Sequence, residues 1–227
     1  MSLELLTECR NVFKCDFLQG FGQTEATTFV TVMSQAEYRK MASDPEQAHK
    51  LESVGKDFPG VHVRVVDEND RDVARGEVGE VIARGDNVMI GYYKMPEETE
   101  EALEGGWLHT GDMGRLDQEG YLYVVDRKKD MIISGGENVY SSEVENVIIG
   151  HPAIAEAAVV GVPDKKWGEV PKAFAVRLPG ADLTEDGLIE YCRENLAGFK
   201  CPKVVVFLES LPRNAAGKVL KRQLREM

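Results

Sequence analysis

The sequence predicts an α+β fold in two parts: a small β-rich subdomain, either a sheet or a distorted barrel, followed by a small α+β domain with a three-stranded sheet. Short apolar runs separated by glycine-bearing turns fill residues 61–125, which is typical of antiparallel β structure. Beyond them, apolar strands alternate with amphipathic helical segments. Residues 1–126 carry 12 basic and 25 acidic side chains (net charge −13), whereas residues 127–227 carry 15 and 14 (net charge +1). This change predicts a domain boundary between residues 126 and 127.

The elements of the first half follow from local pattern. Residues 36–51 are expected to be partly helical, with a break at Asp44-Pro45 because proline cannot continue a helix. Apolar and polar side chains alternate from Val61 onward, which predicts a strand. Further strands are expected over residues 78–85 and 121–125, and a short acidic helix over residues 96–103.

The second half predicts three strands and three helices. The first helix, over residues 142–149, has Ser141 and Ser142 as N-cap candidates, and Glu145 stands at the capping-box position for Ser142. Strands are expected over residues 154–162, 170–178 and 204–208, an amphipathic helix over 184–196, and a basic helical segment over 219–227.

Composition excludes several classes of function. The chain is acidic and has no basic stripe, so it is a poor candidate for nucleic-acid binding. It contains neither an apolar run of membrane-spanning length nor a secretory signal, and we expect a cytoplasmic protein. The four cysteines form no CxxC pair, which favours reduced thiols. The four histidines are scattered, and their spacing predicts no zinc site.

One candidate binding loop is Gln19-Gly20-Phe21-Gly22-Gln23-Thr24-Glu25. Glycines let a loop expose its backbone amides, and a threonine hydroxyl can add a donor to a phosphate group. A neighbouring carboxylate could hold Mg²⁺, which prefers oxygen ligands and substrate phosphates. On composition alone the pattern is weak, because many turns contain two glycines.

The central stretch, residues 126–138, joins the two halves. An apolar run ends at the charged residues 126–130, a second short apolar run follows, and Gly135-Gly136 precedes the helix expected from residue 142. This order predicts a strand, an exposed joint, a strand and a tight turn that lets another molecule approach the backbone. A simple hairpin with a solvated charge run explains the same pattern equally well.

Together these stretches resemble the adenylate-forming superfamily of acyl-CoA synthetases, luciferases and peptide-synthetase adenylation domains. The resemblance rests on residues 19–25, 79–85, 109–112, 126–138 and 212–218, in that order. It implies an acid–thiol ligase in which a carboxylate attacks the α-phosphate of ATP, giving an acyl-adenylate, and the thiol of CoA then forms a thioester and releases AMP. The stretch from Asp130 to Asn138 looks most like fatty-acyl, aryl or malonyl CoA ligases.

The resemblance also implies roles for individual residues. Lys218 would be catalytic, with Thr24 binding phosphate and Glu25 holding Mg²⁺; an ordinary exposed lysine is the alternative for Lys218. The nucleotide, ATP or AMP, would contact Gln19, Gly20, Phe21, Thr24, Asp112, Arg127 and Lys218. CoA would contact Gly135, Gly136, Phe199, Lys200 and Lys203. Lys129 would be the hinge about which residues 127–227 rotate as a mobile lid.

The chain also departs from the superfamily pattern. The phosphate loop and most of the acyl pocket lie upstream of Gly20 in relatives, and no equivalent is found here. We therefore expect residues 1–126 to be the end of a large N-terminal domain, in a fragment that is inactive or nearly so alone. Ile133 stands where many relatives have lysine, and Cys201 where some have arginine. The expected substrate is a fatty or aryl acid, and a homodimer is one expected assembly; a domain that loads a carrier protein, or a non-catalytic binding module, remain alternatives.

Overall fold

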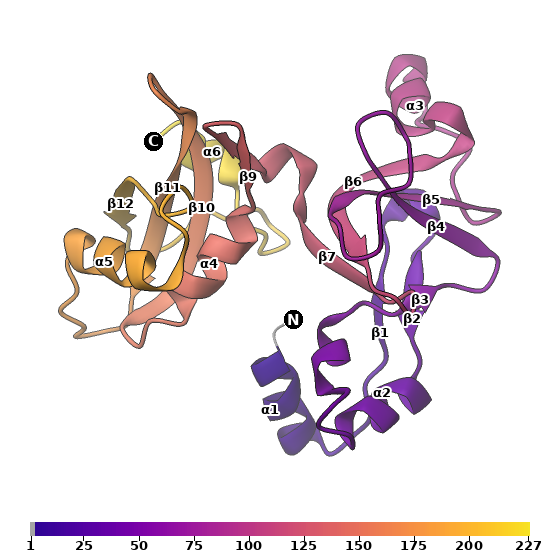
Figure 1. The fold of residues 1–227 in the computed structure, drawn as a ribbon, viewed down its shortest axis with the longest axis horizontal. Coiled ribbons are helices and arrows are strands. Elements are labelled where there is room, and N and C mark those ends of the chain that lie inside the picture. Colours follow the sequence, from indigo (N-terminus) through magenta and orange to yellow (C-terminus); the bar gives the residue numbers. More distant parts are fainter. Residues whose placement is uncertain (1–2) are drawn as a thin grey trace. The chain divides into compact units, whose positions relative to one another are not determined.

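The computed structural model describes residues 3–227 (Figure 1). The chain forms two compact units, which divide between Val125 and Asp126, and we call them unit 1 and unit 2. The division lies one residue before the boundary expected from the change in charge. None of the described helices is long and apolar enough to cross a membrane.

Unit 1 begins with helices around a small antiparallel sheet. The elements are α1 (Leu3–Phe13), β1 (Gln19–Phe21), the 3₁₀ turn η1 (Thr24–Ala26), β2 (Thr31–Met33), α2 (Gln35–Ala42), the 3₁₀ turn η2 (Ala48–Glu52) and β3 (Lys56–Asp57), and the sheet order is β1-β2-β3. A capping box starts α2: the Ser34 hydroxyl accepts from the Glu37 amide, and the Glu37 carboxylate accepts from the Ser34 amide. The break at Asp44-Pro45 lies between α2 and η2, as predicted.

A four-stranded antiparallel sheet completes unit 1. Its strands are β4 (Val61–Val66), β5 (Gly79–Gly85), β6 (Leu108–Leu116) and β7 (Leu122–Arg127), in the order β4-β5-β6-β7, with α3 (Pro96–Ala102) and the 3₁₀ turn η3 (Glu104–Gly106) between β5 and β6. The side chains of Val81, Ile82 and Ala83 on β5 are fully buried. Of the two forms expected for this region, the structure has open sheets, and the described residues close no barrel.

Unit 2 is built on one mixed sheet. Its elements are the 3₁₀ turn η4 (Lys128–Asp130), β8 (Ile132–Ser134), β9 (Glu137–Val139), α4 (Ser141–Ile149), β10 (Ile154–Asp164), β11 (Gly168–Arg177), α5 (Glu185–Asn195), β12 (Val204–Phe207) and α6 (Lys221–Arg225). The three expected strands, β10, β11 and β12, are present, but the sheet has five strands. The addition is the hairpin β8–β9, which forms because Gly135 and Gly136 adopt φ values of +64° and +89° and reverse the chain.

The two faces of this sheet carry separate apolar cores. Successive side chains of a strand point to opposite faces, and on β10 Val159 packs with α4 and α5 while Ala158 and Val160 pack with Leu224 of α6. All three β10 side chains are essentially inaccessible. The sheet is therefore covered by α4 and α5 on one face and by α6 on the other.

The predicted capping box on Ser142 is wrong. The N-cap of α4 is Tyr140, whose own side chain makes no capping hydrogen bond, and the Ser142 amide donates instead to the Asp126 carboxylate at 3.2 Å. Glu145 instead turns into unit 2, where its carboxylate accepts from the Val159 amide at 2.8 Å and lies 2.7 Å from the Lys221 ammonium group. A requirement of the folded unit, namely a partner for Lys221 and for a strand amide, overrides the local helix pattern.

A chain of polar contacts extends from this ion pair to the start of unit 2. Lys221 donates to the Ser141 hydroxyl at 2.6 Å, and Ser141 donates to the Asp126 carboxylate at 2.7 Å. Burial raises the pKa of Glu145, and the nearby Lys221 charge opposes that rise without cancelling it. These four residues, which we call the Glu145 network, fix the start of α6 only three positions after Lys218.

Removing Lys221 should therefore destabilise unit 2 in a pH-dependent way. Because the pKa of Glu145 is raised in the folded state, its contribution to stability is present at low pH and is lost as the pH rises above about 4.5. Lys221→Met should enlarge that loss and reduce the free energy of unfolding by about 2 kcal/mol at pH 7 and by much less at pH 4. The value at pH 7 is below the usual cost of breaking a buried ion pair because this pair keeps some contact with solvent. Urea unfolding at both pH values measures the difference.

The chain offers a clean readout for this test. Each unit contains one of the two tryptophans, so Trp107→Phe leaves Trp167 to report on unit 2 alone. Lys165→Met, at an exposed lysine of the same unit, is the matched control and should show no pH-dependent loss. The double variant Glu145→Gln/Lys221→Met should recover stability at pH 7. If Lys221→Met lowers the free energy of unfolding equally at both pH values, Lys221 does not stabilise the Glu145 charge.

Candidate functional site

The stretch proposed to meet adenine was expected to be a loop, but Gln19–Phe21 forms strand β1, and only Gly22 to Glu25 lie in the turn that follows. Its glycines shape it. A Cβ atom on Gly20 would lie 2.8 Å from the Phe29 ring and 2.9 Å from the Thr31 carbonyl oxygen, and one on Gly22 would lie 1.5 Å from the Thr28 carbonyl oxygen. Both positions therefore require glycine because the β1–β2 backbones approach closely. The Phe21 side chain between them packs against the apolar cores that include β4, β5 and β6.

Three polar side chains of this region have the chemistry that a nucleotide and a cation need. The Oε1 atom of Gln19 is buried and has no hydrogen-bond partner among the described residues, so it can accept from a ligand donor. Thr24 is exposed at the first position of η1. Glu25 is half-buried, and one carboxylate oxygen accepts from the Tyr92 hydroxyl at 2.9 Å. Burial and this carboxylate together raise the pKa of Tyr92.

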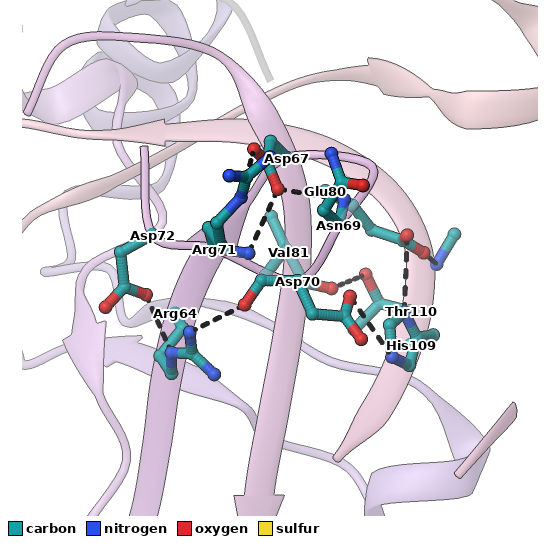
Figure 2. Close-up of polar contacts among 11 residues, drawn as sticks. Arg64, Asp67, Asn69, Asp70, Arg71, Asp72, Glu80, Val81, His109 and Thr110 are labelled. Atoms are coloured by element: carbon teal, nitrogen blue, oxygen red, sulfur yellow. Dashed lines mark hydrogen bonds and ion pairs between the residues drawn. The ribbon is translucent and has the colours of Figure 1, made fainter. Parts of the chain in front are cut away.

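Asp112 lies on a bulge of β6, which contacts of Thr110 and Glu80 hold in place; Figure 2 shows these two residues. Glu80 pairs with Met113 and Ile82 with His109, so the residues between bulge out of the ladder. The Thr110 hydroxyl donates to the Val81 carbonyl at 2.6 Å and accepts from the Asp112 amide at 3.1 Å.

Glu80 supports the same bulge from the neighbouring strand. Its carboxylate accepts from the Gly111 amide at 3.2 Å, and Gly111 has a φ of +68°, a conformation that favours glycine. Space is open where a Gly111 side chain would stand. Asp112 itself is only 6% exposed.

The charged joint is more ordered than a free linker. The Arg127 amide donates to the Asp126 carboxylate at 2.7 Å, and Lys129 is exposed within η4. Arg225 of α6 donates to the Lys129 carbonyl at 3.1 Å and to the Asp130 carboxylate at 2.7 Å. The backbone at the expected hinge is thus tied to the last helix of unit 2.

The two glycines of the β8–β9 turn have different surroundings. A Cβ atom on Gly135 would lie 2.7 Å from the Trp167 ring, and the Gly135 amide donates to the Trp167 carbonyl at 2.8 Å. No atom lies within 4 Å of the corresponding position on Gly136, which requires glycine only for its positive φ. Gly136 therefore presents bare backbone to its surroundings.

The residues expected to meet the CoA nucleotide are only partly available. Phe199 is 38% exposed, and Lys203 is exposed. Lys200, in contrast, donates to both carboxylate oxygens of Glu143 at 2.7 Å. A phosphate group would have to displace Glu143 before it could bind Lys200.

Lys218 lies on a loop that is closed by hydrogen bonds. The Asn214 side chain accepts from the amides of Ala216 and Lys218 at 3.0 and 2.9 Å, and the Asn214 amide donates to the Lys218 carbonyl. Arg213 anchors the base of the loop through an ion pair with Glu156 and a hydrogen bond to the Gly217 carbonyl. The loop holds the Lys218 backbone and leaves its side chain exposed.

The structure places Gln19, Gly20 and Phe21 on β1 and Thr24 and Glu25 on the turn η1, with Asp112 on the larger sheet of unit 1. Arg127, Lys129, Gly135, Gly136, Phe199, Lys200, Lys203 and Lys218 belong to unit 2. The sequence analysis missed the supporting residues Tyr92, Glu80 and Thr110. Glu80 and Thr110 stand inside the stretches that carry the resemblance, whereas nothing near Tyr92 in sequence signals its contact with Glu25.

Comparison with known proteins shows the family of the chain. Residues 1–93 match the model of the AMP-binding enzyme family, and residues 143–218 match that of the AMP-binding enzyme C-terminal domain. A 2-succinylbenzoate–CoA ligase of Bacillus mycoides is 44% identical over 209 residues, covering 92% of this chain and 41% of the relative. The chain thus spans about two fifths of the length of the curated relatives it matches.

Solved structures give the same result. The o-succinylbenzoate CoA synthetase MenE of Bacillus subtilis, in complex with the acyl-adenylate OSB-AMP, matches with a TM-score of 0.85 and 40% identity over 98% of this chain and 43% of that one. ATP-bound MatB of Rhodopseudomonas palustris matches with a TM-score of 0.82 and 39% identity over 92% of this chain and 40% of that one. The chain belongs to the adenylate-forming, AMP-binding enzyme family and is similar to its acyl-CoA ligases.

Proposed function

We propose that these 227 residues are the C-terminal part of an ATP-dependent acid–CoA ligase, AMP-forming, that acts in the cytoplasm on an aryl carboxylic acid. The main support is that both units contain the polar residues expected from the family resemblance. Above all, Asp112 lies on a bulge that hydrogen bonds of Thr110 and Glu80 hold in place. The relatives that are 43–45% identical are named as 2-succinylbenzoate–CoA ligases, which favours an aromatic acid of that kind. The four cysteines are free thiols, consistent with a reducing compartment.

Unit 1 would bind the nucleotide. The unpartnered Gln19 oxygen suits the amino group of adenine, and Asp112, which can only accept hydrogen bonds when ionised, suits the ribose hydroxyls. Arg127 would approach the same ribose. Thr24 would donate to phosphate, and its exposure at the start of η1 is compatible with that role.

The donor set fits magnesium at Glu25. One Glu25 oxygen accepts from Tyr92, which fixes the carboxylate and leaves its other lone pairs for a cation. Mg²⁺ would neutralise charge on the phosphates during transfer. Tyr92 acts through Glu25 and is a positioning residue in this scheme.

Lys218 would act in the first half-reaction. As the substrate carboxylate attacks the α-phosphate and pyrophosphate departs, negative charge builds on the phosphoryl oxygens. A preorganised ammonium group stabilises that charge more than it stabilises the ground state. The hydrogen-bonded loop around Asn214 supports this role, because it holds the Lys218 backbone rigid.

Unit 2 would serve the second half-reaction with a different face. The bare backbone at Gly136 would admit the pantetheine arm, and Phe199, Lys200 and Lys203 would meet the CoA nucleotide. The CoA thiol attacks the acyl carbon, and AMP leaves with the electron pair of the broken acyl–phosphate bond. Rotation about Lys129 would exchange the two faces, as hinges of a few residues do elsewhere.

Replacing Lys218 should separate the half-reactions. In the longer protein that carries this chain, Lys218→Ala should slow adenylation by about a hundredfold or more, because it removes a charge that acts in the transition state. Lys218→Arg should also fail, since the guanidinium fork has a different shape and reach. Thioester formation from supplied acyl-adenylate should be largely intact in single-turnover assays.

Lys165→Ala, at another exposed lysine of unit 2, is the control and should leave both steps unchanged. Supplying a carrier protein in place of CoA in the second step shows which thiol accepts the acyl group. Near-normal adenylation by Lys218→Ala would reduce Lys218 to an ordinary surface residue, and transfer to a carrier protein in preference to CoA would remove the CoA-ligase assignment.

Restricting the hinge should have the opposite selectivity. Lys129→Pro fixes φ while leaving the carbonyl that accepts from Arg225, and Lys129→Ala is the matched control that keeps backbone freedom. We expect Lys129→Pro to slow thioester formation by about tenfold or more while adenylation changes by less than about twofold, because only the second step requires rotation. Equal losses in the two single-turnover assays would exclude the hinge role.

A further inference from the structure

His109 lies among three carboxylates in unit 1, where the sequence spacing predicts no metal site. Its Nδ1 atom is 3.3 Å from a Glu80 oxygen, and its Nε2 atom is 3.9 Å from an Asp70 oxygen (Figure 2). Glu104, on η3, completes the group: ligand atoms of Asp70, Glu104 and His109 all lie within 4.8 Å of one another. These residues come from three separate segments of unit 1.

The contact with Glu80 fixes which tautomer a neutral His109 imidazole adopts. A carboxylate can only accept, so in the neutral ring the Nδ1 atom donates to Glu80 and the Nε2 atom presents its lone pair. The other Glu80 oxygen accepts from the Gly111 amide, and the Glu80 side chain is only 9% exposed. A histidine held by a carboxylate in this way is the usual arrangement of metal-ligating imidazoles.

The Nε2 atom is buried and has no hydrogen-bond partner among residues 3–227. The group that faces it, the Asp70 carboxylate, is another acceptor, and 3.9 Å is too long for a hydrogen bond. A cation between these two electron-pair donors would satisfy both of them. The ligand atoms of one tetrahedral zinc ion lie about 3.4 Å apart. To reach that spacing, the Asp70 carboxylate must move by a few tenths of an ångström and the exposed Glu104 carboxylate by about one ångström.

A rigid turn presents Asp70. The Asp67 carboxylate accepts from the amides of Asn69 and Arg71 at 2.9 and 3.0 Å, and these bonds lower the pKa of Asp67. Arg64 donates to the Asp70 carbonyl at 3.0 Å. Asp70 itself has a φ of +57°, which asparagine and aspartate tolerate better than most residues. Asp70→Asn therefore removes the charge and leaves the turn intact.

We propose that Asp70, Glu104 and His109 bind a divalent transition-metal ion of the zinc class, with Glu80 orienting His109 and a fourth position open to water. One imidazole and two carboxylates suit zinc, whereas Mg²⁺ prefers oxygen ligands alone. The site is separate from the magnesium assigned to Glu25 and does not rest on the ligase function. A bound ion would tie the β4–β5 connection and η3 to His109, three positions before Asp112.

The test uses zinc itself with the whole 227-residue chain, after treatment with a chelator. Cys9→Ser/Cys15→Ser removes the two thiols that are not buried and could compete for the ion. Titration calorimetry should give one zinc ion per chain. The ¹⁵N resonance of His109 Nε2 should shift on zinc addition, while that of Nδ1 should keep the signature of a protonated nitrogen. Millimolar Mg²⁺ should shift neither.

The variants separate ligation from folding. Asp70→Asn/Glu104→Gln changes two exposed side chains and should lower zinc affinity by at least about tenfold, because even losing an outer partner such as Glu80 costs about 10–100-fold. The matched control is His62→Asn, at an exposed histidine on β4, which should bind zinc like the parent chain. The proposal is overturned if zinc leaves the His109 resonances unmoved, if the double variant binds as tightly as the parent, or if Nε2 is already protonated at pH 7.5 and stays so with zinc present.

Discussion

The architecture of unit 2 depends on the requirement that a buried carboxylate must have a partner. Glu145 extends from α4 into the unit, where desolvation raises its pKa, and only Lys221 supplies an opposing charge within the Glu145 network. Lys221 opens α6, and Ser141 carries the same network to Asp126, the first residue of the unit. The helix that covers one face of the sheet, the loop that presents Lys218 and the start of the joint are therefore fixed by one set of contacts.

In unit 1 the main constraint is that the backbone conformation allows only glycine at certain positions. Gly20 and Gly22 are required because neighbouring backbone leaves no room for a side chain, and Gly111 because its φ is positive. Around Gly111, Glu80 and Thr110 hold the bulge that carries Asp112. Glycines that could be taken for ligand-contacting positions thus first serve the fold, and the polar side chains beside them, Gln19, Glu25 and Asp112, retain the chemistry that a nucleotide requires.

Much of this organisation could be predicted from sequence, because strand alternation and helix periodicity are local signals. Strands β4, β5, β10, β11 and β12 and helices α3 and α5 lie within a few residues of their expected bounds. Glu145 could not be predicted, since its partners Lys221 and Val159 are distant in sequence and the capping-box pattern pointed elsewhere. The tight turn at Gly135-Gly136 was expected, but the strand β9 between this turn and α4 was not, because three residues give too short a pattern. Lys200 looked available for CoA, and its pairing with Glu143 depends on how α4 packs in the folded unit.

The proposal depends on these residues carrying the ribose, CoA and lysine contacts of a ligase whose curated relatives are more than twice as long. The direct measurement is ATP–pyrophosphate exchange with 2-succinylbenzoate. It compares the 227-residue chain alone with the same chain joined to the N-terminal three-fifths of the Bacillus mycoides relative, with Asp112→Ala in the joined protein as control. We predict background exchange from the chain alone, clear exchange from the joined protein, and loss of that exchange with Asp112→Ala. Exchange by the chain alone, or a folded joined protein that cannot exchange, would contradict the account.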